Sequence, residues 1–317
     1  MNMFNKYKYP LKLDHTEKLY TVSYGNNLTA NPPSSFDLRD NEVKIGNKYL
    51  PPIYNQGKLG SCTSNALIGA FCFDDVQKYD PVDGIERFDG SRLFHYYNER
   101  KMDGDIYQDG GSTITQGIKA LEKYGVCRES LWPYNDDNEQ FEVTPTDEAY
   151  GNALHHRIVK TNKLNEMHSR NIEQTEKGMK NCLLAGFPFC LGIAIYESFE
   201  NEDVAKEGFV PMPDTRSEEM LGGHAIMCVG YNDDEIDADG NKGCWIMRNS
   251  WGEDWGDNGY FYLPYKYLLK KSLTSDLWQI RCVTDGYDSC EETNAVDTYQ
   301  PNFIMGAMYS LKEKIWG

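Results

Sequence analysis

The chain has 317 residues, of which 49 are Asp or Glu and 32 are Lys or Arg, so its formal net charge is −17 and its pI is near 4.8. Its 40% apolar and 13% aromatic content is that of a folded protein rather than a disordered or collagen-like one. The length suits one large domain or two lobes. The acidic balance and the lack of a long basic run argue against nucleic-acid binding, because phosphate contacts need clustered Lys and Arg.

The sequence shows no signal for membrane insertion or export. Its longest apolar stretch, residues 183–196, has 14 residues and contains a Gly-Phe-Pro break, whereas a bilayer span needs roughly 20. The amino-terminal residues alternate apolar and charged side chains, unlike a secretory signal. We therefore expect an intracellular monomer with no membrane partner. The cytoplasm is the first expectation, and a virion or vacuolar compartment stays open.

Nine cysteines are spread along the chain. Their odd number and the lack of a Cys-x-x-Cys motif fit neither a disulfide scaffold nor the ligand hooks of a zinc site. We expect a largely reduced set of thiols, with no metal and no cofactor. Most of these thiols are predicted to be small core hydrophobes, and Cys62 differs because of its neighbours.

Three helices are predicted, in chain order. Ser61 precedes an apolar run with helical spacing, which places Cys62 in the first turn of a helix. Residues 112–125 begin with capping-type residues and end with Gly, as a second helix would. Residues 135–148 are acidic and polar and are predicted to be a loop, and residues 170–186 are predicted to be the third helix.

The rest of the chain is dominated by short β-branched and aromatic runs. These predicted strands are residues 189–196, 224–231, 244–251, 259–264 and 278–283. A helical first half followed by a strand-rich second half predicts an α+β protein of two lobes.

Two motifs receive a structural interpretation. Residues 233–243 resemble a calcium loop, but their acids miss the required spacing, so a solvated hairpin extension is predicted. His155 and His156 stand just before a predicted strand and are interpreted as structural histidines.

One group of residues has the composition of a nucleophilic site. A reactive thiol needs a lowered pKa, a base, and donors for the oxyanion. Cys62 at a helix N-terminus would gain from the unpaired amides there. Gln56, in a Gly-flanked loop, can turn its amide back beside the thiol. His224 begins a strand and can present its imidazole at a lobe edge, and Asn249 can accept the ring proton.

Four separated motifs, in the same order, resemble those of the papain-like cysteine proteases. They are SSFDLRD, QGKLGSC followed by TSNA, GGHAIMCVGY, and RNSWGEDWGDNGYFYL. The resemblance covers roughly three quarters of the chain, from Ser34 to Tyr262. It implies a papain-like two-lobe fold, with a helical left lobe, a β-barrel-like right lobe and the active-site cleft between them.

The resemblance also implies roles for single residues. Cys62 is expected to be the nucleophile and His224 the base and acid. Asn249 is expected to orient the imidazole, and Gln56 to stabilise the oxyanion together with the Cys62 amide.

Five further residues are expected to bind substrate, again by resemblance. Gly110 and Gly111 would lie along the substrate backbone, and Gly223 and Ala225 would border the bound peptide. Trp251 would shield the Asn249–His224 contact and flank the leaving-group side.

The chain departs from the family pattern in three places. Leu59 and Asp109 stand where secreted members usually carry a disulfide-bonded pair of cysteines, which fits a reducing compartment. Thr63 replaces the Trp that usually follows the nucleophile, so the packing at the helix start must differ. The lead segment of about 33 residues is too short for a helical propeptide domain, although it can still lie in the cleft.

These observations predict five segments of the chain. They are a pro-like or inhibitory segment (1–33), a β-rich right lobe (34–46 and 141–300), a helical left lobe (47–140) and a carboxy-terminal tail (301–317) with no recognised counterpart.

The predicted function is that of a cysteine-type endopeptidase acting on peptides or proteins. It would work through a Cys-His thiolate–imidazolium pair and a thioester acyl-enzyme, and it would be made as a zymogen. Two alternatives stay open. The chain can be an autoinhibited or non-catalytic peptide-binding homologue, with the lead segment in the cleft in cis, or a transpeptidase that uses the same acyl-enzyme.

Overall fold

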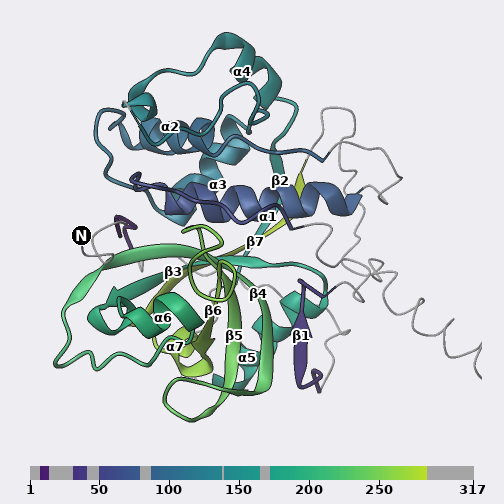
Figure 1. Ribbon diagram of the computed structural model, residues 1–317. Coiled ribbons are helices and arrows are strands. Elements are labelled where there is room, and N and C mark those ends of the chain that lie inside the picture. The colour runs from purple at the N-terminus through teal and green to yellow at the C-terminus, as the bar shows by residue number, and fades with distance from the viewer. Residues whose placement is uncertain are drawn as a thin grey trace, which may run out of the picture.

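The computed structural model describes residues 8–13, 31–40, 50–78, 87–137, 139–164 and 172–283. Helices α1 to α4 lie on one side of the molecule, and an antiparallel sheet with α5 to α7 lies on the other (Figure 1). This confirms the predicted α+β class with two lobes. The predicted tail 301–317 and most of the predicted lead segment fall outside the described residues.

The helices are short apart from α1, α2 and α5. Their bounds are Cys62–Lys78 (α1), Arg92–Asp103 (α2), Ile114–Lys123 (α3), Asp147–Ala153 (α4), Ile172–Leu184 (α5), Glu202–Glu207 (α6) and Tyr265–Leu269 (α7). The three predicted helices are thus confirmed as α1, α3 and α5. The predicted loop 135–148 contains a 3₁₀ turn at Gln140–Glu142 and the first two residues of α4.

Helix α2 was not predicted, because its buried face is partly polar. His95, Asn98 and Glu99 are fully buried in it, so the apolar spacing that usually reveals a helix is interrupted. Its ends do carry ordinary signals. The Ser91 side chain accepts a hydrogen bond from the Phe94 amide, and Gly104 closes the helix with a positive φ of 79°.

The strands form one sheet. Their bounds are Ser35–Asp37 (β1), Ile158–Lys163 (β2), Phe189–Tyr196 (β3), Met220–Ile236 (β4), Lys242–Arg248 (β5), Tyr260–Pro264 (β6) and Thr274–Val283 (β7). Their order is β2-β7-β3-β4-β5-β6, and β1 pairs with β4. All of these pairs are antiparallel.

The β-barrel-like description of this lobe is corrected by that order. Among the described strands, β2 and β6 are the two ends of the path and do not pair with each other. The sheet is therefore open. The sheet can stay open because helix α1 packs on β4 and β7. The helix covers apolar sheet surface that a closed barrel would bury in its interior.

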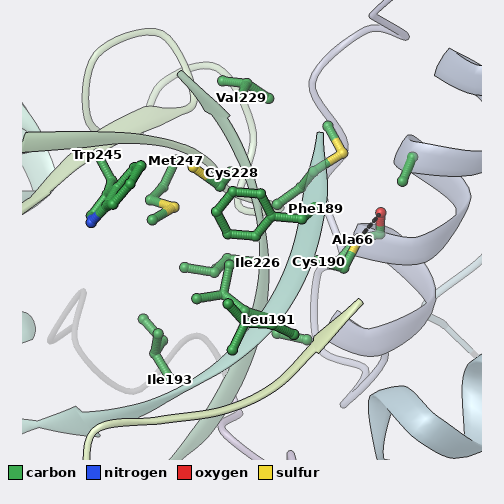
Figure 2. Close-up of a cluster of buried hydrophobic side chains, with 14 of the residues drawn as sticks. Ala66, Phe189, Cys190, Leu191, Ile193, Ile226, Cys228, Val229, Trp245 and Met247 are labelled. Atoms are coloured by element: carbon green, nitrogen blue, oxygen red, sulfur yellow. Dashed lines mark hydrogen bonds between the residues drawn. The ribbon is translucent and has the colours of Figure 1, made fainter. Parts of the chain in front are cut away.

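A single apolar core joins the two lobes. In Figure 2, Phe189, Ile226 and Trp245 lie on the face of the sheet that points away from α1, whereas Cys190 points toward Ala66 of α1. The Cys190 thiol donates to the Ala66 carbonyl oxygen over 3.3 Å, so strand β3 contacts helix α1 directly. A smaller cluster contains residues of α2 and α4, which lie side by side in Figure 1.

The two structural interpretations can now be compared with the fold. Strands β4 and β5 pair from Met227 and Arg248 out to Ile236 and Lys242, which confirms the hairpin extension. The His156 ring stacks on Phe88 with 4.1 Å between ring centroids. Seven cysteines are buried and form no disulfide, namely Cys62, Cys72, Cys127, Cys182, Cys190, Cys228 and Cys244. No helix among the described residues is both long and apolar enough to cross a membrane.

Two helical glycines provide a test of this packing. A Cβ atom at Gly117 would lie 2.4 Å from Leu67 Cδ1 and 2.5 Å from Glu99 Oε1, whereas one at Gly178 would meet nothing within 4 Å. We expect Gly117→Ala to destabilise the fold by about 1–3 kcal/mol through overpacking. Gly178→Ala should stabilise it by about 0.5–1 kcal/mol, because alanine favours the helix. Denaturant unfolding measures both, and equal effects would contradict the packing described.

Candidate active site

Cys62 is the first residue of α1 and lies where that helix meets the sheet. Its side chain is fully buried. The backbone groups of Ala225, of Thr63 and of Cys62 itself lie close enough to the sulfur to favour its thiolate form. Because Ala225 follows His224 on β4, the sulfur lies against the strand that carries the imidazole.

His224 and Asn249 form a buried hydrogen-bonded pair. The distance from His224 Nε2 to Asn249 Oδ1 is 2.8 Å. Asn249 Oδ1 also accepts from the Ser250 amide at 2.8 Å, which identifies this atom as the oxygen, so Nε2 carries the ring proton. In a neutral ring Nδ1 is then an acceptor, and it has no hydrogen-bond partner among the described residues. This is the protonation that a general base requires.

Aromatic rings border the imidazole. Trp251 stacks on His224 with 4.8 Å between ring centroids, and Tyr9 meets His224 edge-on at 6.2 Å. Tyr9 also contacts the Trp251 ring at 5.8 Å. These rings exclude water from the His224–Asn249 hydrogen bond.

Gln56 is fully buried, and its side-chain amide is held in one orientation. Ser250 Oγ donates to Gln56 Oε1 at 2.7 Å, and Gln56 Nε2 donates to the Leu59 carbonyl oxygen at 3.0 Å. A primary amide has two N–H donors, so the second remains for a ligand. Ser250 is a positioning residue that the sequence analysis missed. The motif contained it, but its partner Gln56 lies far away along the chain.

Burial keeps both reacting groups uncharged in this structure. It raises the pKa of the Cys62 thiol to about 12, against the backbone hydrogen bonds that favour the thiolate. It also lowers the pKa of His224 to about 4, against the hydrogen bond with Asn249. The thiolate expected from the helix N-terminus is therefore not favoured while the site is covered.

A buried carboxyl group accepts a hydrogen bond from Thr63, the residue after Cys62. Thr63 Oγ1 donates to Glu99 Oε2 at 2.7 Å, and Glu99 Oε1 lies 3.5 Å from His95 Nδ1. Burial raises the pKa of Glu99 to about 8 and lowers that of His95 to about 4, so both are neutral at pH 7. Thr63 thus replaces an expected Trp by hydrogen bonding to α2, and the sequence analysis missed Glu99.

Two of the three expected substrate-binding glycines, Gly111 and Gly223, lie against residues 8–13. A Cβ atom at Gly111 would be 2.5 Å from the Pro10 oxygen, and one at Gly223 would be 2.4 Å from the Leu11 oxygen. Gly223 N donates to the Tyr9 oxygen and Leu11 N donates to the Gly223 oxygen, both at 3.1 Å. Gly110 has no neighbour within 4 Å of a Cβ position.

Segment 8–13 therefore touches both lobes. Lys12 N donates to the Ser112 oxygen at 3.3 Å, on the helical side, while Gly223 belongs to β4. Figure 1 shows the segment as a short purple stretch between the helices and the sheet.

Asp109 bridges two loops of the helical lobe. Its Oδ1 accepts from the Gly60 amide at 2.8 Å and from the Tyr96 hydroxyl at 2.6 Å. Tyr96 in turn accepts from the Gly111 amide at 3.2 Å. A carboxylate thus links the two segments that the family usually joins by a disulfide.

The described residues contain no group of three or more His, Cys, Asp or Glu placed to hold a metal ion. The chemistry available at this site is that of the thiol, the imidazole and the amide donors.

Comparisons with known proteins identify the family to which this chain is similar. The family described as "Papain family cysteine protease" matches residues 101–272, over half of the chain, a range that includes His224 and Asn249 and begins after Cys62. An uncharacterised peptidase C1-like protein of Acanthamoeba polyphaga mimivirus is 42% identical over 231 residues, or 73% of this chain and 70% of the relative. Cathepsin B-like CP3 of Giardia intestinalis is 27% identical over 72% of this chain and 68% of its own length.

Two solved structures have a fold similar to that of this chain. Xylellain, a cysteine protease from Xylella fastidiosa, superposes with a TM-score of 0.69 and 32% identity, covering 87% of this chain and 95% of its own. Digestive procathepsin L 3 of Tenebrio molitor larval midgut superposes with a TM-score of 0.59, covering 85% and 75% of the two chains. At 16% identity the latter shows the fold alone.

The buried Glu99 leads to a pH-dependent prediction. The unfolded carboxyl ionises near pH 4.3, whereas the folded one keeps its proton until about pH 8. Its raised pKa therefore lowers stability progressively as the pH rises through this window. Glu99→Gln keeps an acceptor for Thr63, so it should raise the melting temperature by several degrees at pH 8 and very little at pH 4.5.

Calorimetry at the two pH values tests this expectation. Glu253→Gln, at an exposed position, controls for the loss of one charge. An equal change in melting temperature at both pH values would show that Glu99 does not retain its proton.

Proposed function

This chain is a member of the papain family of cysteine proteases, and we propose from that starting point that it is an endopeptidase whose nucleophile is Cys62. The observation that supports this most is the 2.8 Å hydrogen bond from His224 Nε2 to Asn249 Oδ1. It leaves Nδ1 as the acceptor on a strand that the Cys62 thiol contacts through Ala225.

In the first proposed half-reaction, His224 Nδ1 takes the thiol proton while the Cys62 sulfur bonds to the substrate carbonyl carbon. The resulting oxyanion accepts hydrogen bonds from the free N–H of Gln56 and from the Cys62 amide. The carbon–nitrogen bond then breaks, and the imidazolium gives its proton to the departing amine. A thioester remains on Cys62.

In the second half-reaction, water attacks the thioester carbonyl as His224 accepts a water proton. The carbon–sulfur bond breaks, the carboxylic acid leaves, and the thiol regains its proton. Ser250 holds the Gln56 amide, so the oxyanion donor is oriented before substrate binds.

We also propose that residues 8–13 reduce the activity of the enzyme in cis, as the inhibitory part of a zymogen. Their backbone forms hydrogen bonds with Ser112 and Gly223. The Tyr9 ring contacts the His224 and Trp251 rings edge-on. Leu11 is 6% exposed, and a Cβ at Gly192 would lie 2.6 Å from its Cδ2. Leu11 thus fills the space that Gly192 leaves beside the cleft.

Cys62→Ala should abolish peptide cleavage and labelling by iodoacetamide, while the melting temperature stays nearly unchanged. The reason is that the thiol forms the covalent intermediate, whereas replacing the Cys62 side chain by a methyl group removes only one buried heavy atom. Turnover of a fluorogenic peptide and mass spectrometry of the labelled protein measure the two effects. Cys72→Ala, in the same helix, is the matched control and should keep activity. Retained turnover in Cys62→Ala would defeat the assignment.

Leu11→Asp should raise both iodoacetamide labelling of Cys62 and turnover by roughly ten-fold or more. The aspartate side chain would lose the packing of Leu11 on Gly192, and burying its charge is unfavourable. The bound state of the segment is therefore destabilised, and the segment leaves the cleft. Lys12→Glu is the control, because the Lys12 side chain is exposed and only its backbone bonds to Ser112. If the two variants label Cys62 at the same rate as the unaltered chain, residues 8–13 do not restrain it.

A further inference from the structure

We propose that Asp109 makes this protease selective for substrates with Arg or Lys at the residue whose carbonyl is attacked. The inference rests on the proposed function, since it assumes that a peptide lies where residues 8–13 now lie. It concerns a residue with no role in the reaction steps above.

The two carboxylate oxygens of Asp109 accept hydrogen bonds from different partners. Oδ1 is used within the protein, by the Gly60 amide and the Tyr96 hydroxyl. Oδ2 accepts from the Lys8 ammonium group, which belongs to the segment in the cleft. The Asp109 side chain is 10% exposed and the Lys8 side chain 54%. The Asp109 carboxylate is therefore a fixed part of the cleft wall, and the Lys8 ammonium group binds to it as a ligand in the cleft would.

The carboxylate lies close to the nucleophile. Gly60, which it binds, is two residues before Cys62. A Cβ atom at Gly60 would be 2.6 Å from Pro10 Cγ and 3.2 Å from Asp109 Oδ1. The missing side chain thus lets a bound chain pass directly beside the carboxylate. Any extended peptide in this place brings a side chain within reach of Oδ2.

The position of Asp109 indicates which substrate residue it contacts. It directly precedes Gly110 and Gly111, and Gly111 closely approaches the Pro10 backbone. Trp251, which we expect on the leaving-group side, stacks on His224 at the opposite lobe. Asp109 is therefore on the acyl side of the scissile bond.

The neighbouring cation does not compete for Oδ2. Arg100 of α2 is close enough to interact with the Asp109 charge, but its guanidinium donates to the carbonyl oxygens of Ile106 and Phe141. The formal charge of −17 adds a general attraction for basic peptides. Within the part of the chain that the structure describes, only Asp109 combines a fixed carboxylate with a cation already bound at the glycine-lined cleft.

The test uses two blocked peptide coumarylamides that differ only in arginine against citrulline, its neutral isostere, at the acyl-side residue. The protein is the full chain carrying Leu11→Asp, which frees the cleft. We expect kcat/KM to favour arginine by roughly ten-fold or more. Asp109→Asn should bring the ratio near one, because asparagine keeps an acceptor for Gly60 and Tyr96 but loses the charge.

Asp137→Asn is the matched control, since it removes a carboxylate of the same lobe that pairs with Lys58. It should keep the preference for arginine. A preference that is absent in the parent chain, or that survives Asp109→Asn, overturns the proposal.

Binding separates this proposal from the proposed function. In the chain with Cys62→Ala and Leu11→Asp, fluorescence polarisation measures the affinity for labelled arginine and citrulline peptides. Tighter arginine binding that is lost in Asp109→Asn supports the subsite even if no peptide is cleaved, in which case only the proposed function fails. Equal affinity for both peptides, or no binding of either, overturns the subsite.

Discussion

The packing of one helix on one sheet determines the geometry of this site. Helix α1 is buried along nearly its whole length between the other helices and the sheet, and a continuous apolar core joins it to β3, β4 and β7. Cys62 is the first residue of that helix, and His224 lies on β4. The separation of sulfur and imidazole therefore depends on core packing between the lobes, which is stiff at native packing density.

Burial and charge oppose each other here. The same rings that protect the His224–Asn249 hydrogen bond also remove the solvation that an ion pair would need. With residues 8–13 in place, desolvation dominates, and both the thiol and the imidazole stay neutral. Reactivity in this protein is thus coupled to hydration of the cleft, because water restores the balance in favour of the charged forms.

Sequence reasoning succeeded where the signal was local. Residues 189–196 form β3 as predicted, since β-branched and apolar residues bounded by a turn suit a buried strand. Helix α2 escaped prediction because its buried residues include Glu99 and His95, whose partners come from other elements. The roles of Ser250 and the place of segment 8–13 depend on contacts between residues far apart in the chain. No periodicity or capping signal reports such contacts.

The bridge between residues 9–11 and Gly223 has a further consequence for how this molecule meets other chains. A ligand attached to its own receptor by a short tether has an effective concentration in the millimolar range. A free peptide of equal intrinsic affinity must therefore reach millimolar levels to compete. The rate at which free peptides bind is therefore limited by dissociation of residues 8–13 from the cleft, rather than by the rate of collision with the cleft.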